Sequence, residues 1–191
     1  MTISRIICCL ALTAMLAGCS DGRSKTAAVP RPTAYPRVAD PGTRYVTVDS
    51  LPVNLSVNAA ATVSHPRPRW LDVSYPDLHV TLHISLTPTS AGEIESVIAN
   101  RSERIALNVA DVSSTGETSL ESDGFSAVII TSPETRSTPL QFLAHDGDSW
   151  VISGAAFFSD VTPEASIDSL APIVSIIERD LIHTLSNLTH K

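Results

Sequence analysis

The sequence predicts an α+β domain in which an antiparallel sheet is covered by two amphipathic helices. Several short segments alternate apolar and polar residues and are joined by short turns, which is typical of neighbouring antiparallel strands. Two longer segments, at about 90–112 and 170–187, repeat apolar residues at helical spacing instead. Each helix has to bury its apolar stripe, and the sheet offers the surface for it.

The first group of strands lies before the first helix. Alternating segments at 44–48 and 53–57 flank Pro52, and 70–75 is a further candidate. The clearest strand is 77–86, whose leucine, valine and isoleucine residues fall on one face. Its opposite face is polar and carries His79, Thr81, His83 and Ser85. Such strict alternation predicts a strand with one buried side.

The second group of strands separates the two helices. The pattern predicts strands at about 118–121, 126–131, 139–145 and 150–158. Asp146-Gly147, between the last two, is a strong signal for a tight hairpin.

The two helices have different start signals. Ser90 or Thr89 caps the first, and Glu93 is placed to close a capping box with Ser90. Ser169 is the expected N-cap of the second, which puts Pro172 at the third helical position, where its missing N–H costs nothing. The order of strands, helix, strands and helix looks like the PsbP/Mog1-type sandwich, a likeness of fold that implies no function.

The N-terminal residues are typical of a lipoprotein signal. Arg5 supplies a positive charge, and 6–16 is an apolar run too short to span a bilayer, which needs about 20 apolar residues. The run ends in Leu16-Ala17-Gly18-Cys19, the form of a lipoprotein cleavage box. We therefore expect removal of 1–18 and a lipid on the thiol of Cys19. The alternative is an ordinary signal peptide followed by a chance cysteine.

The rest of the chain is expected to divide into a tether and one domain. Residues 19–40 hold the lipidated cysteine and a stretch rich in proline, and 41–191 form a single α+β domain. Ser20 after the cysteine, in place of an aspartate, favours the outer membrane. The lack of an acidic cluster behind it favours the side that faces the periplasm. Cys8 and Cys9 lie in the segment to be removed, so the domain has no cysteine for a disulfide or thiolate site.

Composition and motifs argue against several classes of function. A formal net charge of −7 with little lysine disfavours nucleic acid and anionic lipid headgroups as partners. The sequence has no Gly-x-Ser-x-Gly elbow, phosphate-cradling glycine loop or His-Glu-x-x-His helix, so we expect neither an enzyme nor a cofactor. His79 and His83 would lie about 13 Å apart along a strand, too far to share one metal ion. The run 145–149 is interpreted as a hairpin turn, not as a calcium loop.

Three groups of residues are candidate contacts with a partner. The first combines residue types that are enriched at binding hot spots, namely Arg67, Arg69 and Trp70, with a tryptophan packed in the core as the alternative. The second lies in the tether and comprises Arg31, Tyr35 and Arg37. The third is the polar face of the clearest strand, with His79, Thr81 and His83.

Several stretches, in order along the chain, resemble one protein family. The most specific are Gly154-Ala155-Ala156-Phe157-Phe158, Asp168-Ser169-Leu170-Ala171-Pro172 and Asp180-Leu181-Ile182-His183. Upstream lie Pro139-Leu140-Gln141-Phe142, the segment from Trp70 through Tyr75-Pro76 to His83-Ile84-Ser85, and Pro30-Arg31-Pro32 with Tyr35 and Arg37. Together they resemble the gliding motility lipoprotein GldD family of Bacteroidota.

The resemblance implies an outer-membrane lipoprotein without known enzymatic activity. It would be a component or assembly factor of the gliding motility and type IX secretion machinery, acting through contacts with other proteins. Two departures concern these contacts: Thr33-Ala34 replace the usual Arg-Gly, and 52–56 lacks the aromatic residues of the family's strand. The alternatives are a periplasmic module that binds a lipid or small metabolite, a general role in envelope biogenesis, and a spacer between outer membrane and cell wall.

Ser50 is the expected acceptor of an O-linked sugar. Asp49-Ser50-Leu51 and Asp168-Ser169-Leu170 both fit the short glycosylation sequence of Bacteroidota, and Ser169 is already assigned as a helix cap. We expect mass spectrometry of the native protein to find a sugar on Ser50. Native protein without any added sugar would contradict this.

Overall fold

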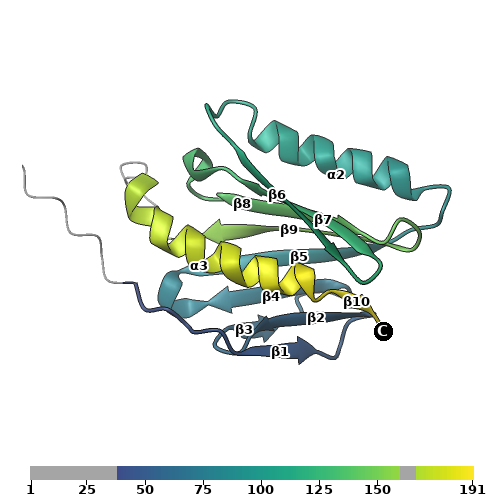
Figure 1. Ribbon diagram of the computed structural model, residues 1–191, viewed down its shortest axis with the longest axis horizontal. Helices are drawn as coiled ribbons and strands as arrows, with labels where there is room; N and C mark the ends of the chain where they lie inside the picture. Colours follow the sequence, from purple (N-terminus) through teal and green to yellow (C-terminus); the bar gives the residue numbers. More distant parts are fainter. Residues whose placement is uncertain (1–37, 160–166) are drawn as a thin grey trace, which may run out of the picture. The chain divides into compact units, whose positions relative to one another are not determined.

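The computed structural model describes residues 38–159 and 167–191, whose strands form two antiparallel sheets (Figure 1). The larger sheet has seven strands in the order β3-β4-β5-β9-β8-β7-β6. Their bounds are Thr62–Ser64 (β3), Trp70–Tyr75 (β4), Val80–Pro88 (β5), Gly116–Ser122 (β6), Phe125–Thr131 (β7), Leu140–His145 (β8) and Trp150–Phe158 (β9). The smaller sheet has the order β1-β2-β10, with bounds Tyr45–Val48, Val53–Asn58 and Thr189–His190. The helices are α2 (Ile94–Asn108) and α3 (Ile167–Ser186).

The two helices lie on opposite faces of the larger sheet. On β8 and β9, Phe142 and Ile152 belong to the main core, whereas their chain neighbours Leu143 and Val151 pack in a separate cluster with Ile94 of α2. Because successive side chains of a strand point to opposite faces, α2 covers the face that is turned away from the main core. The main core is closed by α3 together with the smaller sheet.

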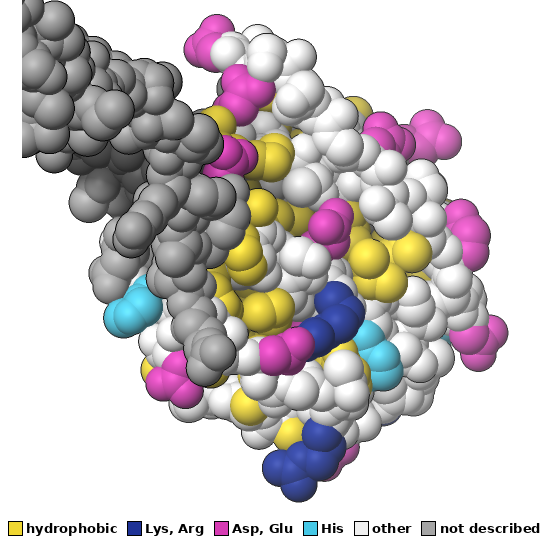
Figure 2. Space-filling view, turned by 60° about the vertical axis from the view of Figure 1, so that its left-hand side comes forward, with side chains coloured by type: hydrophobic (Ala, Val, Ile, Leu, Met, Phe, Trp, Pro, Cys, Tyr) yellow, Lys and Arg dark blue, Asp and Glu magenta, His cyan; other side chains and the backbone are white. Residues whose placement is uncertain are grey.

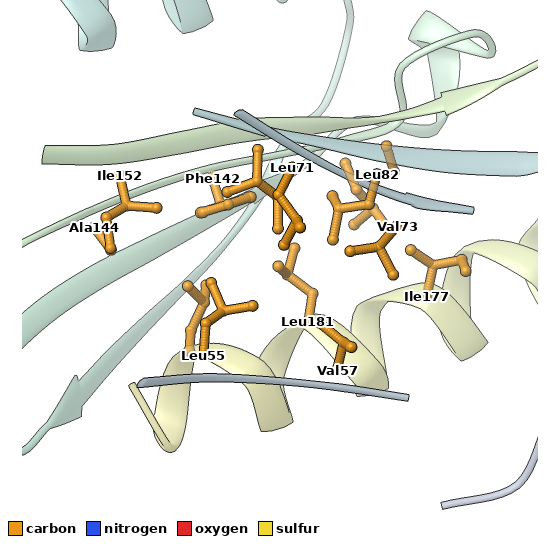
Figure 3. Close-up of a cluster of buried hydrophobic side chains, with 14 of the residues drawn as sticks. Leu55, Val57, Leu71, Val73, Leu82, Phe142, Ala144, Ile152, Ile177 and Leu181 are labelled. Atoms are coloured by element: carbon orange, nitrogen blue, oxygen red, sulfur yellow. The ribbon is translucent and has the colours of Figure 1, made fainter. Parts of the chain in front are cut away.

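Residues of both sheets and of α3 meet in the main core. Figure 3 shows Leu55 and Val57 of β2, and Ile177 and Leu181 of α3, opposite side chains of the larger sheet. These four side chains are almost fully buried, and burying a side chain of this size stabilises the fold by roughly 1.5–3 kcal/mol. The predicted α+β class, with two helices packed on antiparallel sheets, is confirmed.

The strand expected at 77–86 begins later than predicted. Residues 76–78 form a 3-10 turn, and His79 has a left-handed backbone with a φ of 54°. Pro76 has no N–H to donate to a neighbouring strand, and the chain turns here before β5 starts at Val80. The prediction that His79 shares a strand face with Thr81 and His83 is therefore wrong.

The first helix is shorter than predicted. The backbone carbonyl of Ser90 accepts hydrogen bonds from the N–H groups of Glu93 and Ile94, which makes 90–93 a turn before the helix. The Ser90 hydroxyl donates to the Glu93 carboxylate at 2.9 Å, so it does not cap the helix backbone. The helix ends at Asn108 instead of reaching 112.

The second helix starts before its predicted cap. It begins at Ile167, so Ser169 lies inside the helix and is not its N-cap. Pro172 then takes the sixth position instead of the third, where its missing N–H leaves the carbonyl of Asp168 without its helical partner.

Two short strands were not predicted, and the predicted hairpin is confirmed. β3 pairs with β4, and β10 pairs with β2; both are too short to show alternation. In the hairpin between β8 and β9, one carboxylate oxygen of Asp146 accepts the N–H groups of Asp148, Ser149 and Trp150, and Gly147 has a φ of 78°.

Gly154 is a point of close packing between β5, β8 and β9. A Cβ atom at this position would lie 2.3 Å from the His83 carbonyl oxygen and 2.5 Å from Cε1 of Phe142. The ring of Phe142, the register partner of Gly154, therefore packs directly on the glycine backbone.

Gly154→Ala is expected to lower the free energy of unfolding by about 1–3 kcal/mol, because the added methyl group overpacks the core. Gly92→Ala is the control: a Cβ there meets no atom within 4 Å, and the expected change is within about 0.5 kcal/mol. Urea unfolding of both variants measures the difference. Equal stability of the two variants would contradict this account of the packing.

Candidate functional site

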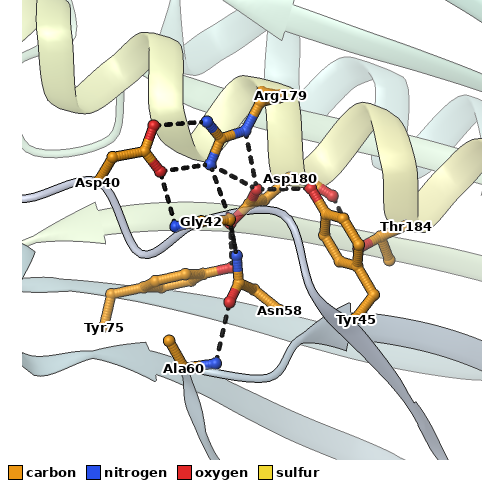
Figure 4. Close-up of polar contacts among 9 residues, drawn as sticks. All are labelled: Asp40, Gly42, Tyr45, Asn58, Ala60, Tyr75, Arg179, Asp180 and Thr184. Carbon is orange, nitrogen blue, oxygen red and sulfur yellow. Dashed lines mark hydrogen bonds and ion pairs between the residues drawn. The ribbon is translucent and has the colours of Figure 1, made fainter.

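One cluster of polar side chains surrounds Asp180, a buried carboxylate on α3 (Figure 4). The hydroxyls of Tyr45 and Tyr75 donate to it at 2.8 and 3.2 Å, and the amide of Asn58 donates at 2.9 Å. Arg179 pairs with it at 3.2 Å. Since the tyrosines and Asn58 come from β1, β4 and β2, one carboxylate joins both sheets to α3.

Arg179 extends this cluster to the N-terminal segment 38–44. Its two terminal nitrogens donate to the Asp40 carboxylate at 2.8 and 3.0 Å, and one of them also donates to the Gly42 carbonyl at 3.2 Å. The hydrogen bonds from Arg179 lower the pKa of Asp40 from 3.8 to about 2. Burial, and then the Asp180 carboxylate, raise the pKa of both Tyr45 and Tyr75.

The Asp180 cluster is saturated with its own contacts. One oxygen of Asp180 accepts hydrogen bonds from Tyr45 and from Nε and Nη2 of Arg179, and the other accepts them from Asn58 and Tyr75. The raised pKa of the tyrosines keeps them protonated as donors at neutral pH. These contacts give the cluster a structural task, which is to fix α3 and the N-terminal segment on the sheets.

A second group of side chains lies on the opposite face of the larger sheet and is open. We call it the Arg–Trp face and define it as Arg67, Trp70, His83, Arg101 and Arg104. Trp70 is 44 % exposed, so the alternative that it packs in the core is wrong. The guanidinium carbon of Arg67 lies 5.2 Å from the centre of the indole ring, in cation–π geometry.

His83 and Asp72 form a pair on this face. They are register partners on β5 and β4, and Nδ1 of His83 lies 2.8 Å from the Asp72 carboxylate. Phe157, which is 43 % exposed, lies beside His83 with 6.4 Å between ring centres. Among the described residues, no hydroxyl or thiol is hydrogen-bonded to the other nitrogen of His83.

A cavity of about 200 Å³ opens between α2 and strands β4, β5, β8 and β9 of the larger sheet. Ser85, Ser153 and Ala155 line its floor, and Arg101, Arg104 and Ile105 of α2 form its wall. Trp70, His83 and Gln141 also line it. Gln141 is only 3 % exposed, and its Oε1 accepts a hydrogen bond from Asn108 at 2.9 Å. Its Nε2 has no acceptor among the described residues.

Most cations of the described residues have no carboxylate partner. These cations are Arg44, Arg67, Arg69, Arg101, Arg104, Arg136, Arg179 and Lys191, and only Arg179 pairs with a described carboxylate. On the face seen in Figure 2, acidic side chains are scattered over the surface and cationic ones are few. The three guanidinium groups of the Arg–Trp face are thus a local concentration of unpaired positive charge on an acidic protein.

The structure brings together part of the predicted contact residues. Arg67, Trp70 and His83 are neighbours, and Thr81 lies on the same face, where its hydroxyl is 3.1 Å from that of Ser74. Arg69 precedes β4 with a left-handed backbone, and its carbonyl accepts the N–H of Leu86. Cys19, Arg31, Tyr35 and Arg37 lie outside the described residues.

Arg101, Arg104 and Gln141 were missed as candidate residues. The arginines were expected on the solvent side of the first helix, yet both line the cavity. Arg101 falls between Val97 and Ile105 in the apolar stripe of α2, and this position in the 3.6-residue period was the available signal. Gln141 offered no such signal, because its environment depends on α2, which is distant in sequence.

Within 38–159 and 167–191, no three His, Cys, Asp or Glu side chains are placed to hold a metal ion together. In the same part of the chain, no helix combines the length and the apolar character needed to cross a membrane.

The comparison with protein families covers most of the chain. A family model described as "Gliding motility lipoprotein GldD" matches residues 25–190. The match includes both sheets and both helices of the described part. No curated protein matches the chain.

Asp40→Asn is expected to make the domain less stable at neutral pH, because it removes the ion pair with Arg179. Folding lowers the pKa of Asp40 from 3.8 to about 2. The carboxylate therefore stabilises the fold fully above about pH 5, and its contribution is lost as the pH falls through 4 towards 2. The difference in unfolding free energy between wild type and variant should shrink over this range.

Asp111→Asn is the control for Asp40→Asn, since Asp111 is exposed and forms no ion pair with the described residues. Urea unfolding at several pH values measures both differences. A difference for Asp40→Asn that is the same at pH 7 and pH 2.5 would show that the ion pair does not stabilise the domain.

Proposed function

Because the chain belongs to the gliding motility lipoprotein GldD family, we propose that it is a non-catalytic component or assembly factor of the gliding motility and type IX secretion machinery. It would act by contacting other proteins through the Arg–Trp face. The exposed Trp70, with Arg67 over its ring, is the single observation that carries this assignment. Tryptophan and arginine are the residue types most enriched at binding hot spots.

The position of the chain in the cell is part of this proposal. A lipid on Cys19 would anchor it in the outer membrane, with the domain on the periplasmic side. Residues 19–37, which lie outside the described part, are rich in proline, a composition that favours tethers extended at about 3.1 Å per residue, whereas Asp40 is held on the domain by Arg179. The tether would let the domain reach partners at a distance from the bilayer. The finer fold assignment, a PsbP/Mog1-like sandwich, remains a proposal supported by a sheet with helices on both faces.

The size of the cavity beside Trp70 favours a protein contact at the Arg–Trp face over the capture of a lipid or metabolite there. Pockets for small ligands usually measure about 300–1,000 Å³ and enclose most of the ligand. The cavity under α2 has about 200 Å³, which suits one inserted side chain. Trp70 and Phe157 are exposed on the sheet face, and a small ligand in the cavity would leave most of their exposed surface uncovered.

The proposed function is tested by deleting the gene and restoring it with Trp70→Ala. Deletion is expected to abolish secretion of type IX cargo and, where the host glides, surface motility. Trp70→Ala should accumulate to wild-type level and still reduce both. Val46→Ala is the control, because Val46 is likewise exposed, at 48 %, but lies on β1. Deletion that leaves both processes intact would overturn the proposal.

A further inference from the structure

We propose that the Arg–Trp face binds an acidic segment of a partner protein, one carboxylate of which enters the cavity under α2. This inference rests on the proposed function, because it specifies the chemistry of the partner that the face contacts.

The Arg–Trp face carries positive charge that no described carboxylate neutralises. Arg67, Arg101 and Arg104 lie around one site, and none of them pairs with a carboxylate of the described residues. Asp72 is the acidic residue on this face, and it is engaged by His83 at 2.8 Å. Guanidinium groups bind carboxylates through two parallel hydrogen bonds. The site therefore offers positive charge to a ligand although the chain as a whole carries −7.

Two residues that line the cavity have buried hydrogen-bond donors without acceptors. Nε2 of Gln141 and Nε of Arg101 are both buried and lack an acceptor among the described residues. Both residues line the cavity. Leaving a buried donor unpaired costs about 1–3 kcal/mol. A carboxylate that enters the cavity brings two acceptor oxygens next to these residues.

Exposed apolar rings lie next to the cavity. The cavity, at about 200 Å³, is smaller than usual ligand pockets, so most of a peptide ligand has to lie on the surface. There it meets Trp70, which lines the cavity, and Phe157, which lies farther along β9 beside His83. Both rings are more than two-fifths exposed. A peptide segment with an acidic residue between apolar residues would place its carboxylate in the cavity and its apolar side chains against Trp70 and Phe157.

The test uses the purified full-length chain in detergent and three probes. The first is a fluorescein-labelled peptide with three repeats of Gly-Leu-Glu, the second has Gln in place of every Glu, and the third is free glutarate. Fluorescence polarisation is expected to detect binding of the Glu peptide, weakened by salt, and at least tenfold weaker binding of the Gln peptide. Glutarate should not compete at the concentration at which the unlabelled Glu peptide does.

Two variants tie this binding to the cavity. Arg104→Gln and Gln141→Leu should each weaken binding of the Glu peptide about tenfold, the ratio expected when a hydrogen bond to a charged group is lost. Arg44→Gln removes the same charge from an exposed arginine next to β1 and should leave binding unchanged. Gln141 is buried, so its variant is checked by thermal unfolding, and Arg104→Gln provides an independent test.

Three results would overturn the inference. Equal binding of the Glu and Gln peptides would show that no carboxylate is recognised. Full competition by glutarate would identify a site for small acids and not for a peptide. Absence of binding by the Glu peptide would remove the acidic segment. If the deletion and Trp70→Ala phenotypes are present in that case, the proposed function stands and only the chemistry of the partner is wrong.

Discussion

The buried carboxylate of Asp180 is the contact on which the arrangement of the domain depends. It takes hydrogen bonds from β1, β2 and β4, and its neighbour Arg179 holds the N-terminal segment through Asp40. Leaving a buried acceptor without one of its donors costs about 1–3 kcal/mol, a sizeable part of the roughly 5–15 kcal/mol that stabilises an average domain. Apolar packing alone would let α3 slide or rotate, whereas these directed contacts fix its position.

Because α3 and the smaller sheet are fixed on one face of the larger sheet, the other face can stay open. The main core, between the larger sheet, the smaller sheet and α3, contains most of the buried apolar residues. The cluster under α2 is small, with Ile94, Leu143 and Val151 as its buried members. Stability therefore does not require α2 to cover the whole sheet, and the polar parts of β4, β5 and β9 remain available for binding.

The sequence allowed prediction of most elements of the fold but of only part of the site. Periodicity is a local property, so β5 and the apolar stripes of both helices were evident. The alternation at 77–86 looked continuous in the sequence because Leu78 is apolar and buried. In the structure, Leu78 belongs to the turn that starts at Pro76, and the left-handed His79 separates it from β5. Asp180 stands in the apolar stripe of α3, where its partners come from three distant strands. The same holds for Gln141 and Arg101, whose meeting depends on how α2 is placed on the sheet.

The pairing of β10 with β2 has a consequence for how the chain reaches its folded state. β2 is completed by Thr189 and His190, more than a hundred residues later in the chain, and the Lys191 ammonium group donates to the carbonyls of Asp49 and Leu51. The small sheet thus cannot close before Thr189 and His190 have been synthesised. Contacts of such long sequence separation form slowly. Closure of the small sheet is therefore expected to follow the formation of the local hairpins β6-β7, β7-β8 and β8-β9 in the larger sheet.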